Sequence, residues 1–325
     1  MPPGWAVPTV EGDLPHRAPC THEDATVNLL DPFGLLTSAL PLPAQPVDDP
    51  RVVLITGATS GIGQATALRA AAEGHDVVLV ARREEKLREV ARDCDEAGAA
   101  STLVVPADLS DDDAVAAMVA TVLESHERID TVLHCAGVVS YGRTEETSAQ
   151  DFADVVSTNL LGTAAVARHV LPVLRRQRRG DLVVVGSLLG YIAVPEMTPY
   201  VVSKWGVRAL VRQLRIENVD LPQVRISHVS PGSVDTPIYD NALDSAGAVN
   251  TPPPPSISPE RVARVVLAQV GSRRATRQTA LSNYGLMAVF TLAPAAAYDR
   301  LVGPLFQLAS RRKSGGDDAG TEGAA

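Results

Sequence analysis

The sequence predicts an α/β fold in which a doubly wound parallel sheet is covered by helices on both faces. From residue 51 onward, short and continuously apolar runs alternate with stretches of helical periodicity. Fully apolar strands are typical of a parallel sheet that is buried on both sides. A glycine-rich turn also follows the first apolar run and leads into the first helix. Because crossover connections are right-handed, such a sheet binds its ligand at the carboxyl ends of its strands.

Strands and helices are expected to alternate along the chain. The apolar runs predict strands at 52–55, 77–80, 102–105, 131–134, 182–185 and 224–229. Helical patterns follow at about 61–73, 84–94, 149–179 and 200–218, with one more helix opened by Ser110. Three aspartates after Ser110 favour a helix start, because they complement the helix dipole. Gly74 is expected to end the first helix in a left-handed conformation.

Composition divides the 325 residues into four parts. Residues 1–50 are rich in proline and predict an irregular arm, or else an over-long start of the reading frame. Residues 51–282 form the predicted single α/β domain of Rossmann type, with a proline-rich loop or lid at 241–259. An apolar helical extension is expected at 283–313, and a disordered tail at 314–325.

Charge and cysteine content exclude several classes of protein. The net charge of −9 argues against nucleic-acid binding, which needs a clustered basic surface. Cys20, Cys94 and Cys135 are scattered and odd in number, so we expect neither a disulfide framework nor a metal site. No secretory leader is expected either, since the amino terminus lacks a charged start followed by an apolar run. These features favour a cytoplasmic protein.

The glycine turn has the form of a phosphate-binding loop. Gly57, Gly61 and Gly63 follow a predicted strand and open a predicted helix. Glycine lets the backbone turn tightly and approach a pyrophosphate, and the helix N-terminus supplies N–H donors. Such a turn is weak support for nucleotide binding when it stands alone.

A second motif predicts proton transfer. Tyr200 and Lys204 lie one helical turn apart, so both side chains share one face. The chain has only three lysines, which makes this spacing less prone to accident. A free tyrosine has a pKa near 10, but a neighbouring ammonium favours the phenolate. Ser187 follows a predicted strand and is placed to hydrogen-bond a reacting oxygen.

Together these motifs resemble the short-chain dehydrogenase/reductase family over about residues 51–270. The resemblance implies the catalytic residues Asn159, Ser187, Tyr200 and Lys204. It implies cofactor contacts from Gly57, Thr59, Ser60, Gly61, Ile62, Gly63, Arg82, Arg83, Asp108, Leu109, Ala136, Gly137, Asn159, Tyr200, Lys204, Pro231, Gly232 and Thr236. Within these sets, Asn159 is expected to support a water that leads to the lysine, and Asp108 to contact the adenine ring.

The second strand indicates NADP rather than NAD. At its end stands Ala81, where a carboxylate would bind the ribose hydroxyls of NAD. Arg82 and Arg83 follow, and a guanidinium matches the geometry of the 2′-phosphate of NADP. The other interpretation is that these arginines merely begin a solvated helix.

One loop departs from the family pattern. His134 and Cys135 stand where the family usually has two asparagines, before Ala136 and Gly137. The departure affects hydrogen bonding at the strand end more than chemistry. A nucleophile pair is not expected, because adjacent strand residues point to opposite faces.

The predicted function is an NADP-dependent oxidoreductase that interconverts a hydrophobic carbonyl compound and its alcohol. The residues placed around the reacting oxygen are mostly apolar and carry no charge. They are Leu188, Leu189, Tyr191, Val194, Ile238 and Tyr239. Two alternatives stay open: a non-catalytic NADP-binding sensor or scaffold on the same fold, and a nucleotide-sugar epimerase or dehydratase.

Interactions with other partners are expected on two grounds. The family resemblance implies a homo-oligomer, a dimer or tetramer, formed through the helices at about 149–179 and 200–218. Between Arg277 and Asp299 the chain carries no charge. Pro294 interrupts this stretch, so we expect helices that pack on the body or on a sister subunit, with a peripheral membrane contact through 283–313 as the alternative.

Overall fold

A computed structural model describes residues 50–239, 243–244 and 255–314. The predicted arm and tail therefore lie almost wholly outside the described residues, as does most of the predicted loop at 241–259.

The core is a seven-stranded sheet in which every neighbouring pair is parallel. The strand order is β3-β2-β1-β4-β6-β7-β9. The strands are β1 (Val52–Thr56), β2 (Asp76–Ala81), β3 (Ser101–Pro106), β4 (Thr131–His134), β6 (Gly180–Val185), β7 (Val224–Ser230) and β9 (Thr276–Gln278). The order reverses between β1 and β4, which confirms the doubly wound fold and places a crevice at their carboxyl ends. A separate pair, β5 (Ser140–Tyr141) and β8 (Leu243–Asp244), forms a small parallel sheet.

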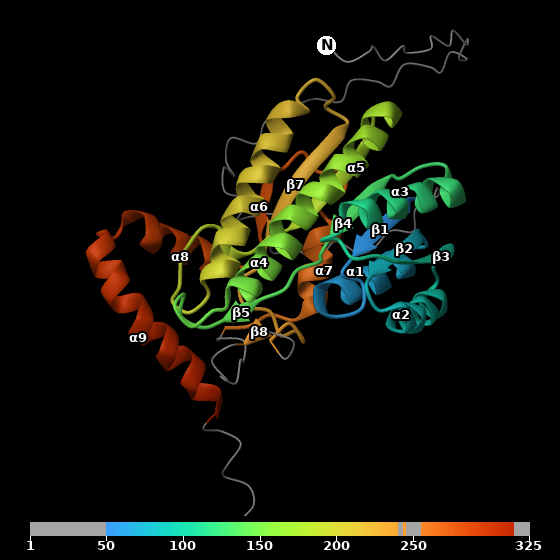
Figure 1. Ribbon diagram of the computed structural model, residues 1–325. Helices are drawn as coiled ribbons and strands as arrows, with labels where there is room; N and C mark the ends of the chain where they lie inside the picture. The colour runs from blue at the N-terminus through green and yellow to red at the C-terminus, as the bar shows by residue number, and fades with distance from the viewer. Residues whose placement is uncertain (1–49, 240–242, 245–254, 315–325) are drawn as a thin grey trace, which may run out of the picture. The chain divides into compact units, whose positions relative to one another are not determined.

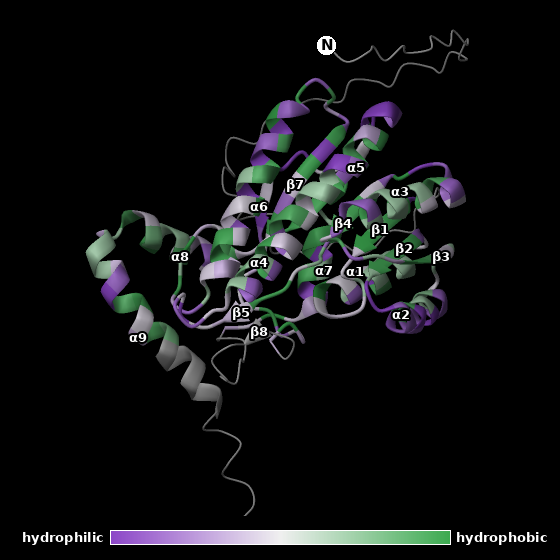
Figure 2. Ribbon diagram, in the orientation of Figure 1, coloured by the Kyte–Doolittle hydropathy of each residue, from purple (hydrophilic) through white to green (hydrophobic). Residues whose placement is uncertain are grey.

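Helices cover both faces of the sheet (Figure 1). One apolar cluster joins the sheet to α3, α5 and α6, and a second joins it to α1, α2 and α7. Figure 2 shows hydrophobic residues concentrated on the central strands and hydrophilic residues on the outer helix α2. The helices are α1 (Gly61–Ala72), α2 (Glu84–Ala97), α3 (Asp112–His126), α4 (Ala149–Val156), α5 (Gly162–Gln177), α6 (Thr198–Glu217), α7 (Pro259–Leu267), α8 (Leu281–Leu292) and α9 (Ala295–Ser314).

The helix predicted at 149–179 is continuous from Ala149 to Gln177, but it contains an unpredicted π-helical turn. A π-helical turn, Ser157–Leu161, separates α4 from α5. The Thr163 hydroxyl donates to the main-chain carbonyl of Asn159 at 2.5 Å, and the Asn159 side chain is bound to another loop. Such local widening is typical of functional sites. Periodicity does not reveal it, because the apolar pattern continues through the turn.

The start of α3 also differs from the prediction. Asp111, not Ser110, is the N-cap, and its carboxylate accepts from the amides of Asp113 and Ala114. The Ser110 hydroxyl instead donates to Asp108 at 2.7 Å. A carboxylate therefore takes the capping position while the serine closes the preceding turn. Gly74 has φ +79° directly after α1, as predicted.

The uncharged stretch after β9 folds into the helix pair α8 and α9, broken at Pro294 (Figure 1). Several of its leucines and valines are exposed. Among the described residues, no helix is both long and apolar enough to cross a membrane.

Candidate active site

The glycine turn joins β1 to α1 in a conformation that favours glycine. Gly57 has φ +67° and Gly61 has φ +52°. A Cβ atom on Gly57 would lie 2.8 Å from the Ala136 Cα atom, and one on Gly63 would overlap the carbonyl oxygen of Gly57. The turn is thus packed against the loop after β4, with no room for side chains.

The first turn of α1 leaves its amide groups available. Ser60 is the N-cap, but its side chain makes no capping hydrogen bond, and no acidic residue lies in the first turn. Ile62 is the second residue of the helix, and Thr59 is buried beside it. Free N–H groups at a helix start form an anion site. Thr236 reaches this turn from the loop after β7, since a Cβ on Gly61 would lie 3.0 Å from its methyl group.

The predicted arginines lie at the same edge of the sheet, after β2. Arg82 and Arg83 are exposed, and Arg83 is the N-cap of α2. Burial opposes ionisation of Asp108, but hydrogen bonds from Ser110 and the charge of Arg82 outweigh it and lower the pKa of the carboxyl. Leu109 is buried beside Asp108. The residues predicted to contact the cofactor after β1, β2 and β3 therefore lie at one edge of the sheet, as the fold predicts.

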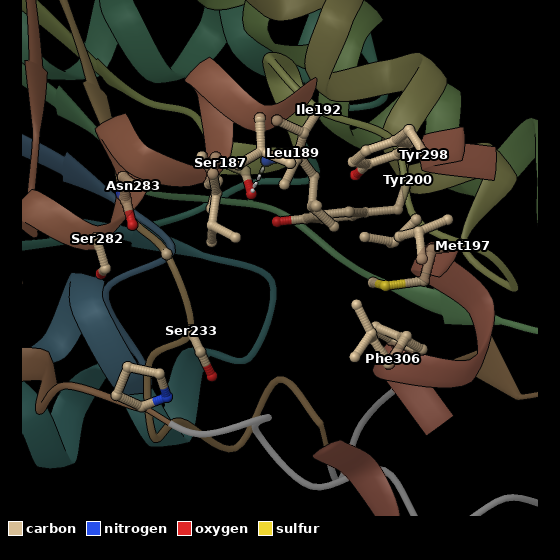
Figure 3. A pocket seen from close by; sticks show the side chains of 18 of the residues that line it. Ser187, Leu189, Ile192, Met197, Tyr200, Ser233, Ser282, Asn283, Tyr298 and Phe306 are labelled. Atoms are coloured by element: carbon tan, nitrogen blue, oxygen red, sulfur yellow. Dashed lines mark hydrogen bonds between the residues drawn. The ribbon is translucent and has the colours of Figure 1, made fainter. Parts of the chain in front are cut away.

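Ser187, Tyr200 and Lys204 come together from two elements. Ser187 follows β6 and begins the short 3-10 helix Leu188–Gly190, where its hydroxyl accepts from the amide of Leu189 at 3.1 Å. Tyr200 and Lys204 share one face of α6, with the lysine Nζ atom 5.5 Å from the tyrosine ring centroid. The Ser187 and Tyr200 side chains line the same pocket, and Figure 3 shows both hydroxyl oxygens in it.

The protonation of this group differs from the expectation. Burial raises the pKa of Tyr200 to about 12, although the neighbouring Ser187 hydroxyl lowers this pKa. Burial also lowers the pKa of Lys204 to about 8. The expected lowering of the phenol pKa is therefore not produced by the protein's own groups. The physical reason is desolvation, which disfavours both the phenolate and the ammonium.

Asn159 and Ser203 form a network behind the lysine. The Asn159 Oδ1 atom accepts from the amide of Val138 at 2.8 Å, and its Nδ2 atom donates to the Val138 carbonyl and to the Ser203 hydroxyl. Gly137 adjoins this network, because a Cβ there would lie 3.4 Å from the Lys204 Nζ atom. Sequence reasoning missed Ser203, whose position just before the lysine on α6 was the available signal.

His134 and Cys135 are structural, as expected. Both nitrogens of His134 are hydrogen-bonded, to Thr56 and to Thr163, each at 2.9 Å. Burial lowers the pKa of His134 to about 3 and raises that of the Cys135 thiol to about 12. The thiol is bound to Thr66 on the opposite side of the sheet. A protonated, buried thiol is a poor nucleophile.

A pocket of about 460 Å³ opens beside the Tyr200 hydroxyl (Figure 3). Among the described residues, its lining contains no Asp, Glu, Lys, Arg or His. Five of the residues predicted to surround the substrate line it: Leu188, Leu189, Val194, Ile238 and Tyr239.

Tyr191, the sixth residue predicted to contact the substrate, does not line this pocket. Its ring lies against the Arg208 guanidinium, 3.8 Å from the ring centroid. Residues of α8 and α9 line the pocket instead and were not predicted individually. The apolar composition of this stretch did predict helices that pack on the body or on a sister subunit.

The turn after β7 joins the pocket to the strand end. Gly232 lines the pocket, and the carbonyl of Pro231 accepts from the amide of Leu188 at 2.6 Å. On the other side, Asn283 at the start of α8 donates to the Ser230 carbonyl at 3.1 Å. This turn is therefore fixed between Ser187 and the helical extension.

The model of the short-chain dehydrogenase family matches residues 51–246, which is more than half of the chain. The chain belongs to this family. The match covers the glycine turn, β6 and α6, so the predicted resemblance is confirmed. The parallel sheet of this short-chain dehydrogenase, flanked by helices, confirms the predicted fold class.

Known proteins similar to this short-chain dehydrogenase include both relatives and solved structures. The human protein "Dehydrogenase/reductase SDR family member 7" is 35% identical over 195 residues, 59% of this chain and 58% of the relative. The chain thus spans less than two thirds of that relative's length. An alcohol dehydrogenase from Thermococcus sibiricus, complexed with 5-hydroxy-NADP, is 30% identical with a TM-score of 0.62, over 70% of this chain and 95% of that one.

A short-chain dehydrogenase/reductase from Burkholderia phymatum, in complex with NAD, is 26% identical. Its TM-score is 0.67, and the alignment covers 74% of this chain and 92% of that one. The solved structures similar to this chain therefore include complexes with either form of the cofactor.

Proposed function

We propose that this short-chain dehydrogenase is an NADP(H)-dependent oxidoreductase that interconverts a hydrophobic ketone or aldehyde and its alcohol. One observation carries the proposal. The hydroxyls of Ser187 and Tyr200 face one uncharged pocket, with the Lys204 amine one helical turn from the tyrosine. This arrangement suits proton exchange with an oxygen held in the pocket.

The residues present fit a dinucleotide. The turn at Gly57 and Gly61 has no side chain to obstruct a pyrophosphate, and the open first turn of α1 offers amides to it. The turn at Pro231 and Gly232, with Thr236, would hold the nicotinamide end. When bound, NADP(H) supplies the hydride chemistry.

The preference for NADP rests on the end of β2. Ala81 offers no carboxylate to a ribose hydroxyl, and the guanidinium groups of Arg82 and Arg83 are exposed there. A 2′-phosphate would form charge-assisted hydrogen bonds with them. The complex of the Thermococcus protein with an NADP derivative agrees with this choice, whereas the Burkholderia protein binds NAD.

Tyr200 is the proposed general acid and base. With its pKa raised to about 12 by burial, the phenol keeps its proton at neutral pH and can donate it to a carbonyl oxygen. Ser187 orients that oxygen through its hydroxyl. In the oxidative direction, the alcohol proton returns to Tyr200.

Lys204 and Asn159 support the phenol. With a pKa of about 8, the lysine is mostly an ammonium at neutral pH and favours the phenolate left after proton donation. Asn159 holds the Val138 loop beside it through two hydrogen bonds. Its proposed role is to order a water that connects the lysine to solvent.

The test is a panel of hydrophobic ketones with NADPH, followed by the loss of nicotinamide absorbance. We expect turnover by the native protein and at least a hundredfold lower kcat for Tyr200→Phe, since general acid catalysis contributes about 10²–10⁴-fold. NADPH binding, measured by fluorescence titration, should be retained in the variant. Equal rates in the two proteins would refute the assignment.

The two alternative functions predict other results. A non-catalytic sensor would retain its cellular function after Tyr200→Phe. An epimerase or dehydratase would turn over a nucleotide sugar with no net change in nicotinamide absorbance. The uncharged pocket disfavours the latter, because a nucleotide sugar carries phosphates that need charged or polar partners.

We also propose a homo-oligomer assembled through α4, α5 and α6. Leu161 ends the π-helical turn between α4 and α5, and Val202 and Ile216 lie on α6; their exposed fractions are 57%, 47% and 54%. Exposed apolar side chains of this kind are typical of subunit contacts. Light scattering at working concentration should give a multiple of the chain's 34.2 kDa; a monomer would contradict the assembly.

A further inference from the structure

We propose that the substrate is an uncharged, linear amphiphile with one polar end, whose carbonyl meets Tyr200 and whose aliphatic tail runs along α8 and α9. This proposal rests on the proposed function and specifies its substrate class. The argument has three parts: where polar atoms lie in the pocket, what holds the outer wall, and where the pocket opens.

The serine and asparagine side chains of the pocket lie at one side, while the Tyr298 hydroxyl at the other side donates to the Ala193 carbonyl. In Figure 3, Ser233, Ser282 and Asn283 lie on one side of the Tyr200 oxygen, whereas Met197 and Phe306 lie on the other. Apolar side chains from the loop before α6 and from the helical extension also line the pocket. They are Ile192, Val194, Met197, Leu286, Val289, Leu301, Val302, Leu305 and Phe306. A substrate therefore finds partners for one polar group at Ser187 and Tyr200, and apolar surface beyond it.

The outer wall is attached to the body at several points. At the base of α8, the buried Asn283 donates to Ser230 and to Gln278. Near the helix break, the Tyr298 hydroxyl donates to the Ala193 carbonyl at 2.8 Å. Phe290 packs edge-on against Tyr298 at 4.9 Å between ring centroids, and against Trp205 at 6.2 Å. Because α8 is held at its base and near the helix break, this part of the pocket wall is fixed to the body.

The pocket opens along the same helices. Val289, Leu301 and Leu305 line it, yet 55%, 60% and 62% of their surface is exposed. Each side chain thus has one edge in the pocket and another in solvent. A tail longer than the pocket can leave between these side chains while it still covers their apolar surface.

The lining also excludes charged tails. With no Asp, Glu, Lys, Arg or His among its described residues, the pocket offers no charged partner to a carboxylate or phosphate. Burial of an unpaired charge is strongly unfavourable. A bulky polycyclic ketone would also be compatible with the pocket volume. Only a linear substrate, however, predicts that kcat/KM rises with the length of an aliphatic chain.

The experiment is a homologous series of 2-alkanones, from butanone to dodecanone, assayed with NADPH below their solubility limits. For the native protein, we expect kcat/KM to rise about three- to fourfold per methylene over the first additions, then to level off once the tail passes α9. A terminal carboxylate on the long ketone should lower kcat/KM by at least tenfold.

Variants locate the tail. Leu301→Ala and Phe306→Ala should lower kcat/KM for the long ketones about tenfold more than for butanone. Leu292→Ala is the matched control, because this leucine on α8 is 81% exposed and does not line the pocket. It should alter neither end of the series.

Three results would overturn the proposal: rates independent of chain length, equal turnover of the carboxylated ketone, or equal losses for short and long ketones in the two pocket variants. Failure of the proposed function is distinct from these, since no ketone of any length would then consume NADPH. Preference for a polycyclic ketone, with a flat alkanone series, counts against the linear amphiphile alone.

Discussion

The imidazole ring of His228 occupies the space that a side chain at position 186 would need. A Cβ atom on Gly186 would overlap the His228 Nε2 atom. The ring lies between β6 and β7, with its Nδ1 atom 2.9 Å from the Ser230 hydroxyl, and within the described residues its Nε2 atom has no hydrogen-bond partner. The strand end that presents Ser187 is therefore fitted to a histidine on the neighbouring strand.

This fit predicts compensation between the two positions. Gly186→Ala should lower the free energy of unfolding by about 1–3 kcal/mol and displace Ser187, because it overpacks the strand end. His228→Ala in the same chain should restore most of the loss. Urea unfolding and NADPH turnover of both single variants and the double variant would measure the coupling. If the losses in the free energy of unfolding were additive, the overlap between the two side chains would not contribute to stability.

Two buried histidines predict loss of stability in acid. Burial lowers the pKa of both His134 and His228 to about 3, against 6.5 in the unfolded chain. Between these values only the unfolded chain binds the protons, so stability falls as pH drops below 6.5. At pH 5.5 the loss approaches about 1.4 kcal/mol for each ring. Urea midpoints from pH 7 to 5 would show it. His134→Gln should reduce the slope, and an unchanged slope would contradict the assignment.

Cofactor choice is predicted to depend on the arginines after β2. Arg82→Ala with Arg83→Ala should raise the KM for NADPH about ten- to a hundredfold, since hydrogen bonds to a charged group contribute about 1.5–3 kcal/mol. The KM for NADH should stay the same. Arg88→Ala is the control, because this residue of α2 pairs with Glu84. Equal changes for both cofactors would show that no 2′-phosphate is bound there.

Asn283 is predicted to couple the helical extension to the turn at Pro231 and Gly232. Asn283→Leu keeps the approximate volume but removes the donor to Ser230 and Gln278. Loss of a buried hydrogen-bond partner costs about 1–3 kcal/mol, so the Tm should fall. If Asn283 positions Gly232, the Kd for NADPH should also rise, whereas a purely structural role would change only the Tm. Thr291→Ala, at an exposed site on α8, is the control.

Much of the fold could be predicted because its signals are local. Each central strand is a continuous apolar run, and the glycine turn lies directly between β1 and α1. Tyr200 and Lys204 are one turn apart on a single helix, so their shared face follows from helical geometry. The Asp111 cap of α3 and the π-helical turn at Asn159 were not predicted, because both depend on how individual side chains are hydrogen-bonded.

The sequence by itself determined the parallel sheet, the phosphate turn and the order of Ser187, Tyr200 and Lys204. Only the tertiary structure decided that Asn159 contacts Ser203, that His228 requires Gly186, and that α8 and α9 wall the pocket. Each of these relations joins residues far apart in the chain. Periodicity and spacing record the geometry of neighbouring residues, whereas packing between distant segments is set by the three-dimensional shape that they form together.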